Sequence, residues 1–297
     1  MVTIEQLEAL DYRQWFRSGI AAAELSCCDE SQISRRSQAC TKIFRLKIKR
    51  CNEYELVGDS TLLNMQRAIH QYVRFSGSDH ILLRLDATHL IRKLLLNPPL
   101  VGWILGPCDH RGNEVMLSLL RNRVIDAYIT SDLLGLPQSN IFSVILLWNW
   151  PGELHANSYH PLHKQRKLSR GDIDQFPSLV IPQNLYPEIA ASVHAMGFGK
   201  NSKLDRFDIG SWDRIGDDNK TLFYGSCLSQ DANADVAKIF FNTDYQGGEA
   251  LIILREFLNS PAISLLIEDL KARYKLAEQK FPQLVYRFQL LKSENSN

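Results

Sequence analysis

Hydrophobic and polar positions follow two successive patterns along the chain. Residues 4–16 and 30–44 place apolar side chains at close to helical spacing, and an alanine-rich stretch at 20–28 predicts a short helix between them. Residues 46–50 and 55–59 then alternate as two short strands around a polar turn. Three helices followed by a β-hairpin predict a winged helix-turn-helix over residues 1–59.

The second pattern begins after a long amphipathic helix at 60–75 and a short polar segment, so we expect a linker and hinge over residues 60–79. From residue 80 onward strands and helices alternate, which is typical of an α/β domain spanning 80–297. We expect strands at 80–87, 100–107, 125–131, 141–150, 177–182 and 248–257, helices at 88–97, 113–124, 184–197 and 261–279, and a polar loop around residues 155–163.

Charge is distributed unevenly in a chain whose net charge is only +1. No acid interrupts the segment from Ser31 to Arg50, which carries Arg35, Arg36, Lys42, Arg45, Lys47, Lys49 and Arg50. A local charge block in a nearly neutral protein indicates a local partner of opposite charge.

The third helix presents this charge in a definite direction. Asp29 is expected to cap the helix, with Gln32 reaching back as in a capping box. Ile33, Ser37, Cys40 and Phe44 form an inward stripe, which leaves the polar side chains to face outward. This third helix of the chain is the second helix of the helix-turn-helix motif, the one that enters the DNA major groove. There arginine reads guanine, glutamine reads adenine and lysine meets phosphate. The predicted DNA-binding residues are Gln32, Ser34, Arg35, Arg36, Lys42, Lys49 and Arg50. The alternative is a solvated basic face.

These motifs resemble the LysR-type transcriptional regulators over nearly the whole chain. The family's serine, alanine pair and Ser-Arg step fall on Ser18, Ala22, Ala23, Ser34 and Arg35, and "HPLHKQRKLSRGDIDQFPSLV" resembles its regulatory-domain loop and strand. Two departures stand out: Arg45 replaces the usual glycine after the recognition helix, and Glu30 stands where a base-contacting glutamine is common. The family's glycine-rich stretch is missing near residues 211–226.

The resemblance implies a regulatory domain of two α/β subdomains, similar to type 2 periplasmic binding proteins. They would span about 80–144 with 248–297, and about 145–247. It also implies double-stranded DNA and a small-molecule effector as partners, and a homodimer or homotetramer paired through the 60–75 helix.

Polar residues that follow predicted strands are the candidates for binding the effector. Ligands of open α/β sheets bind beyond the carboxyl ends of strands, where helix N-termini favour anions. The candidates match positions that line the family's effector cleft, and they indicate a small, anionic metabolite: Thr88, His89, Thr130, Ser131, Gln183 and Asn184. The alternative for Thr88 and Asn184 is that they simply cap helices. A further alternative is that the protein is a regulator that has lost its response to an effector.

Other chemistry finds little support in the sequence. His155, His160 and His163 lack an acid or cysteine at ligand spacing, and Cys108 beside Asp109 and His110 lacks an orienting third group. We therefore expect no metal, no cofactor and no enzymatic activity. The start of the chain shows no secretory signal, no apolar run could span a membrane, and six scattered cysteines indicate reduced, buried thiols in a cytoplasm. The alternative function is a cytoplasmic small-molecule-binding or enzymatic α/β protein whose N-terminal helices only mediate assembly.

Overall fold

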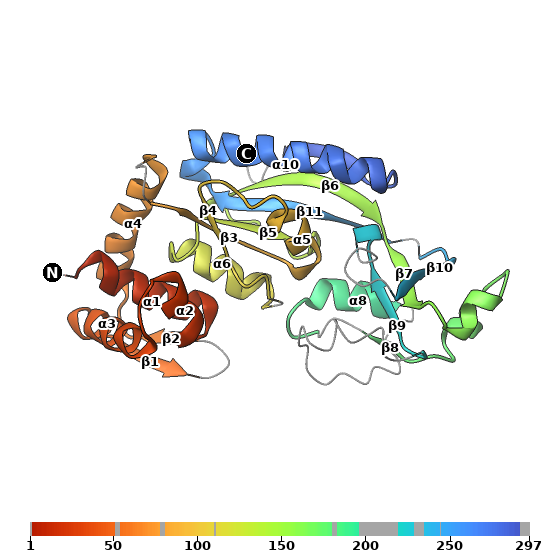
Figure 1. Cartoon of the computed structure of the whole chain (residues 1–297), viewed down its shortest axis with the longest axis horizontal. Helices are drawn as coiled ribbons and strands as arrows, with labels where there is room; N and C mark the ends of the chain where they lie inside the picture. Colours follow the sequence, from red (N-terminus) through yellow and green to blue (C-terminus); the bar gives the residue numbers. More distant parts are fainter. Residues whose placement is uncertain are drawn as a thin grey trace. The chain divides into compact units, whose positions relative to one another are not determined.

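The computed structural model describes residues 2–50, 54–77, 81–109, 111–179, 183–195, 219–228, 235–243 and 245–291, without the side chains of Arg50, Leu90 and Lys93. The chain forms two compact units, and Figure 1 labels its helices and strands. The first consists of Met1–Asp86, Val101–Pro107 and Leu117–Tyr128, and the second of Ala87–Leu100, Cys108–Met116 and Ile129–Asn297. The domain boundaries expected from the sequence remain predictions.

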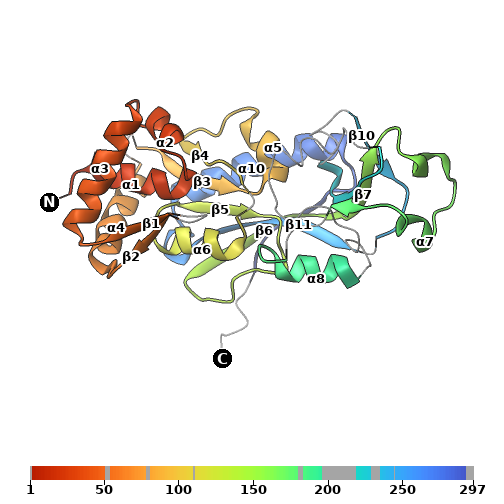
Figure 2. The same ribbon diagram turned by 90° about the horizontal axis from the view of Figure 1, so that it is seen from below.

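The first unit opens with the expected winged helix-turn-helix. Helices α1 (Ile4–Phe16), α2 (Gly19–Leu25) and α3 (Glu30–Ile43) precede the antiparallel hairpin of β1 (Lys47–Arg50) and β2 (Tyr54–Val57). In Figure 2 these elements cluster together, with the hairpin beside the helices. Leu7, Leu10, Cys40, Leu46 and Leu63 form their core. Ala22 and Ala23 of α2 are buried, and their small side chains let the helices pack closely.

Local capping signals explain where these helices begin. Thr3 caps α1 and Asp29 caps α3, each in a capping box completed by Gln6 and Gln32 respectively. Ser18 caps α2 by accepting the N–H of Ala21. Each cap satisfies backbone donors that a helix start leaves unpaired. The capping box predicted at Asp29 is therefore confirmed.

Two further parts of the first unit follow the hairpin. Helix α4 (Thr61–Phe75) is the predicted linker helix. Strand β3 (Leu83–Ala87) pairs in parallel with β4 (Trp103–Leu105), and every residue of β3 is buried. The residues of helix α6 (Asn113–Arg121) and of strand β5 (Ala127–Thr130) are divided between the two units. This strand–helix alternation confirms the predicted α/β class.

The main sheet of the second unit contains β6 (Phe142–Pro151), β11 (Gln246–Leu254) and β12 (Val285–Leu291), with β6 antiparallel to both neighbours. Helix α10 (Pro261–Lys280) lies along β6 and β11 in Figures 1 and 2. Tyr274 of α10 lies 6.1 Å from Trp148 of β6 between ring centroids. Pro261 occupies the first turn of α10, as predicted.

A second sheet has the strand order β10-β7-β9-β8, where β7 is Glu153–Asn157, β8 Ser178–Leu179, β9 Leu222–Gly225 and β10 Val236–Ile239. The short helix α7 (Arg170–Ile173) and helix α8 (Pro187–Ala195) belong to the same unit. The core here is built from buried residues that include Leu154, Leu162, Tyr186 and Leu222.

Three sequence predictions require correction. His155 lies in strand β7 rather than in a loop; the polar residues of this strand, Glu153, His155 and Asn157, are buried, so it has no apolar signature. The helix expected at 88–97 is a 3₁₀ turn (His89–Ile91) followed by α5 (Arg92–Leu96). Cys27 is exposed, although Cys40, Cys108 and Cys227 are buried as expected. No helix of the described ranges is long and apolar enough to cross a membrane.

Candidate nucleic-acid interface and effector site

Helix α3 has two chemically distinct faces. Its inner face buries Ile33, Ser37 and Cys40, three of the four residues of the predicted stripe, while Phe44 follows the helix and is half-buried. The outer face is polar, and the hairpin continues its positive charge. The exposed cations are Arg35 and Lys42 on α3, Arg45 after it, and Lys47 and Lys49 on β1. A helix and wing that carry this charge can meet the phosphates on both sides of a DNA groove.

The first turn of α3 orders the side chains that would face bases. Ser31 donates to Asp29 Oδ1 at 2.6 Å, and Arg35 Nη2 donates to Ser31 Oγ at 3.4 Å. The Ser31 hydroxyl and the Gln32 N–H lower the pKa of Asp29, so the cap stays ionised. Arg35 is thereby tethered to the helix start while its side chain remains exposed.

The other predicted contact residues are placed less uniformly. Gln32 Oε1 accepts the Asp29 N–H at 3.4 Å. To read adenine with both the oxygen and the nitrogen of its side-chain amide, Gln32 would have to break this capping bond. Arg36 is half-buried and its Nη1 lies 3.8 Å from Cys28 Sγ, back toward the turn. Ser34 is also half-buried, and Arg50 has its side chain outside the described set. Arg35 is therefore the arginine of the pair that projects outward.

Glu30 has a structural partner that accounts for an acid at this position. A Cβ atom placed on Gly19 would lie 2.4 Å from Glu30 Oε1, so the carboxylate packs against the first residue of α2. A negative charge near a helix N-terminus is favourable. Gly19 leaves the space that this carboxylate occupies.

Arg45 occupies the position that favours glycine because the helix ends there in a left-handed turn. Its φ is +55°. The N–H of Leu46 bonds to the carbonyl of Thr41 at 2.8 Å, and the N–H of Arg45 bonds to that of Lys42 at 3.2 Å. These two bonds define a Schellman motif, whose C′ residue is usually glycine. The chain therefore accepts backbone strain and gains a cation beside the recognition helix.

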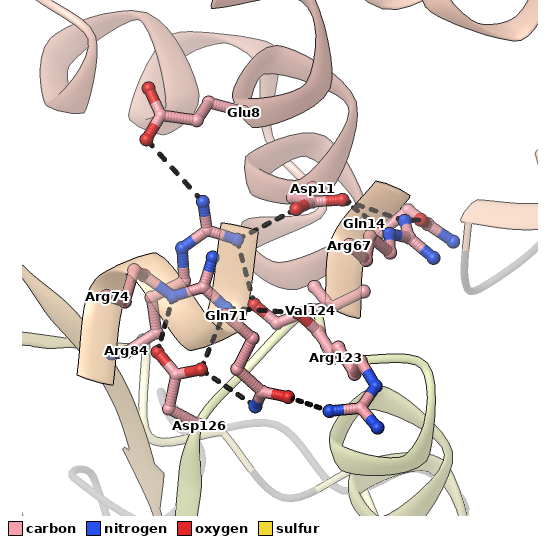
Figure 3. A network of polar contacts seen from close by, with 10 residues as sticks. All are labelled: Glu8, Asp11, Gln14, Arg67, Gln71, Arg74, Arg84, Arg123, Val124 and Asp126. Atoms are coloured by element: carbon pink, nitrogen blue, oxygen red, sulfur yellow. Dashed lines mark hydrogen bonds and ion pairs between the residues drawn. The ribbon is translucent and has the colours of Figure 1, made fainter. Parts of the chain in front are cut away.

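A buried polar network ties α1 and α4 to the α/β part of the first unit (Figure 3). Asp11 of α1 accepts from Arg67 of α4 at 2.8 Å and from Arg84 of β3 at 2.8 Å. Burial alone would lower the pKa of Arg84, but Asp11, Tyr12 and Asp126 together raise it, so Arg84 stays charged. Trp15 Nε1 adds a bond of 2.6 Å to Asp86.

The same network continues through α4. Asp126 accepts from Arg74 Nε and Nη2 at 2.8 and 2.7 Å, and from Gln71 at 2.9 Å. Arg123 in turn donates to Gln71, as Figure 3 shows. Sequence reasoning missed this network. Its only signal was the presence of Arg84 and Asp86 within an otherwise apolar strand.

Helix α4 therefore turns its polar face inward and its apolar face outward. Arg67, Gln71 and Arg74 are buried. Leu62, Met65 and Ile69 are 66%, 59% and 60% exposed, and Tyr72 and Val73 extend the same exposed surface. This spacing of three and four residues makes one continuous apolar stripe.

The candidate effector residues differ in what their side chains can still contact. The Thr88 and Ser131 hydroxyls lie 2.6 Å apart, and Thr88 stands at the N-cap of the 3₁₀ turn without a side-chain capping bond, so its hydroxyl is not used for capping. Thr130 is buried, and its hydroxyl donates to Asn113 and accepts the Asp132 N–H at 3.0 Å.

The other candidates, His89, Gln183 and Asn184, differ from Thr88 and Ser131 in exposure and position. His89 is half-buried and follows Thr88 directly. Gln183 and Asn184 are exposed in a turn, and α8 begins only at Pro187. Asn184 therefore does not adjoin the helix start that the sequence suggested. Thr88 and Ser131 remain the candidates whose hydroxyls lie together.

A residue missed by sequence reasoning lies directly behind this pair. Glu249 of β11 is fully buried, and Ser131 Oγ lies 3.4 Å from its Oε1. Trp150 Nε1 donates to both carboxylate oxygens at 3.0 Å. Burial raises the pKa of Glu249 to about 8, against the opposing effect of these donors.

Metal and nucleophile chemistry find no support among the described residues. No group of three histidines, cysteines or acids there could hold a metal ion. His155 stacks on Phe223 at 5.3 Å, and burial together with Lys238 lowers the pKa of His155 to about 4. Cys108 is buried, and its neighbour His110 lies outside the described residues.

Comparisons with known proteins define the fold. No known family model and no curated protein matches the chain by sequence. Its structure is similar to a full-length OxyR variant from Pseudomonas aeruginosa, with a TM-score of 0.55, 13% identity, and coverage of 91% of this chain and 95% of that one. Full-length BenM gives a TM-score of 0.52 at 14% identity, covering 93% and 97%. Full-length CbnR complexed with its target DNA gives 0.52 at 13%, covering 92% and 100%.

These solved proteins are LysR-family regulators, and the match extends over more than nine-tenths of the chain. The chain therefore has the fold of the LysR-type transcriptional regulators. The winged helix-turn-helix, the linker helix and the periplasmic-binding-protein-like α/β architecture expected from the sequence are confirmed together.

Proposed function

We propose that this protein is a sequence-specific DNA-binding transcriptional regulator whose α/β part senses a small metabolite. The observation that carries the proposal is the outward face of α3, where exposed Arg35 and Lys42 are continued by Lys47 and Lys49 on the hairpin. Arg35 is the base-reading candidate, with Gln32, Ser34 and Arg36 beside it. Lys42, Lys49 and Arg50 would supply phosphate contacts. The solved CbnR complex with target DNA supports this assignment through its shared fold.

Dimerisation through α4 completes the DNA-binding proposal. Its exposed apolar stripe has the helical spacing that two helices bury against each other. A second copy of the chain fits because a two-fold axis brings the same stripe to both sides of the interface. The two recognition helices would then read half-sites about one helical turn apart, or multiples of it. A homotetramer would pair two such dimers.

The effector proposed for the α/β part is a small anionic metabolite. Thr88 and Ser131 would hold it, with His89, Gln183 and Asn184 around them and Thr130 fixing the local geometry. Hydroxyl and amide groups donate hydrogen bonds to carboxylates. A ligand changes DNA binding only if it prefers one arrangement of the protein over another. We propose no catalysis and a cytoplasmic location.

Selection of bound fragments from the source genome, at two salt concentrations, tests the function. A recurrent two-fold symmetric site that survives the higher salt supports a sequence-specific regulator. Diffuse recovery that disappears with salt would mean that the basic face gives only non-specific attraction. The alternative, an α/β binding protein or enzyme with assembling helices, would then be favoured.

A further inference from the structure

Glu249 is the last of three hydrogen-bonding residues in a row, of which Thr88 is the proposed effector contact and Ser131 lies between the two. Thr88 Oγ1 and Ser131 Oγ are 2.6 Å apart, and Ser131 Oγ is 3.4 Å from Glu249 Oε1. Trp150 Nε1 donates to both oxygens of the carboxyl group at 3.0 Å. All four residues belong to the second unit.

Among the described residues, the groups that favour the ionised form of Glu249 are hydrogen-bond donors. Burial raises its pKa most, and the hydrogen bonds from the Trp150 indole and the Ser131 hydroxyl oppose that rise. Burial is the main reason that the pKa values of Tyr245 and Cys227 are raised to about 12, and the nearby Glu249 charge adds to it, so both groups are neutral near pH 7. Asp132 also acts on Tyr245 and adds only negative charge. Within the part of the chain that the structure describes, an ionised Glu249 therefore has hydrogen-bond donors to offset its burial and no cation among the groups that act on its pKa.

Counting protons shows what the hydroxyl pair can offer a ligand. Each hydroxyl has one proton to donate. When Glu249 is ionised, Ser131 donates to it and Thr88 donates to Ser131, so the pair has no proton left for a ligand. When Glu249 is protonated, it can donate to Ser131, Ser131 can donate to Thr88, and the Thr88 proton is not used by either of the other two groups. The protonation state of Glu249 thus sets the direction in which the hydrogen bonds between Glu249, Ser131 and Thr88 are donated.

We propose that Glu249 makes effector binding proton-linked: a carboxylate at Thr88 binds the form in which Glu249 is protonated, so that binding takes up one proton from solvent wherever Glu249 is ionised in the free protein. This inference rests on the proposed effector site and adds its specificity-determining residue. A carboxylate that loses the Thr88 donor also meets the negative charge of Glu249, so both effects favour the protonated form. Affinity for an anion should fall by up to about tenfold for each pH unit above about 8.

The first experiment needs no ligand. Tryptophan fluorescence of the full chain is titrated from pH 6 to 10, with Trp150→Phe identifying the reporter. A transition near pH 8 should be present in the wild type, absent in Glu249→Gln and unchanged in Glu268→Gln, an exposed acid of α10. Ser131→Ala removes a donor to the carboxylate and should move the transition upward. Persistence of the transition in Glu249→Gln, or no shift in Ser131→Ala, overturns the proposal.

The second experiment adds simple anions. Acetate, succinate, benzoate and phosphate are each compared with sodium chloride of equal ionic strength, and the melting temperature is recorded at pH 6.5 and 9.5. A carboxylate that stabilises the wild type should do so mainly at pH 6.5, and should stabilise Glu249→Gln similarly at both. Thr88→Val should lose the effect in either background. Phosphate alone stabilising the protein would overturn the choice of a carboxylate.

The two hypotheses fail in different ways. Equal carboxylate stabilisation of the wild type at both pH values overturns the proton linkage and leaves the effector site standing. No stabilisation by any carboxylate at pH 6.5 overturns the anionic effector and the linkage together. Fragment selection still reports on DNA binding in either case.

Discussion

Asp11 and Arg84 are 73 residues apart in the chain and form an ion pair of 2.8 Å, with side chains only 1% and 2% exposed. The pair joins the first helix of the helix-turn-helix to a strand of the α/β part within one compact unit. Asp11 also forms an ion pair with Arg67, so removing the Asp11 charge leaves the buried guanidinium groups of Arg67 and Arg84 without this carboxylate partner. The helix-turn-helix is therefore structurally continuous with strand β3 of the same unit.

Asp11→Asn should destabilise the protein by about 3–5 kcal/mol, the usual consequence of breaking a buried ion pair by removing one partner. Urea denaturation followed by circular dichroism measures this. Glu8→Gln is the matched control, because Glu8 is 35% exposed and lies 3.7 Å from Arg84, so its loss should cost under about 1 kcal/mol. Equal effects from both substitutions would show that Asp11 is not the centre of the network.

Arg45→Gly should stabilise the protein by about 1 kcal/mol, because Arg45 adopts a left-handed conformation that costs a residue with a side chain about this much. The change removes one positive charge, so Lys42→Gly is the control. It removes the same charge within helix α3 and should destabilise by about 1 kcal/mol. The two denaturation midpoints should move in opposite directions. A loss of stability in Arg45→Gly would refute the account of the helix end.

Ile69→Glu should convert the assembled protein to monomers, because it places a charge in the middle of the apolar stripe of α4. Sedimentation equilibrium measures the mass. Thr61→Glu adds the same charge at an exposed position at the start of the same helix and should leave the assembly intact. A monomeric wild type, or an Ile69→Glu variant that stays assembled, would show that this stripe is not the interface.

The stability of the wild type should fall between about pH 5 and pH 8 relative to Glu249→Gln. Burial raises the pKa of Glu249 from 4.5 to about 8. The unfolded chain therefore loses this proton near pH 4.5, and the folded chain retains it up to about pH 8. Since the folded state binds more protons in this window, stability declines as pH rises, by at most about 1.4 kcal/mol per pH unit. Denaturation at pH 5, 6.5 and 8 measures the trend, and parallel curves for both proteins would contradict it.

The parts of the fold that could be predicted were those with local causes. Asp29 and Gln32 predict a helix start because their side chains form a capping box. The inward stripe of α3 follows from the helical spacing of its buried residues. Pro261 marks the start of α10 in the same way. Elements whose burial depends on distant polar partners escaped prediction. Strand β7 buries Glu153, which pairs with Lys238 from β10, and nothing nearby in the sequence signals that contact.

The candidate sites divide along the same line. Arg35 could be placed outward because helical periodicity fixes its direction. Gln32 was assigned to both capping and base reading, and the structure shows its oxygen engaged in the cap. The inverted faces of α4 depend on Asp11 and Asp126, which lie far away in the chain. Glu249 belongs to an apolar strand, and only the tertiary structure brings it behind Ser131.

The affinity of the selected DNA fragment for the wild type, Arg35→Ala and Lys49→Ala, measured over a range of salt concentrations, tests the central claim most directly. Arg35→Ala should lose about 1–3 kcal/mol on the selected site and little on unrelated DNA. Lys49→Ala should weaken binding to both sequences and reduce the salt dependence by about one phosphate contact. If neither substitution changes binding to the selected fragment, helix α3 and its wing are not the DNA-reading surface.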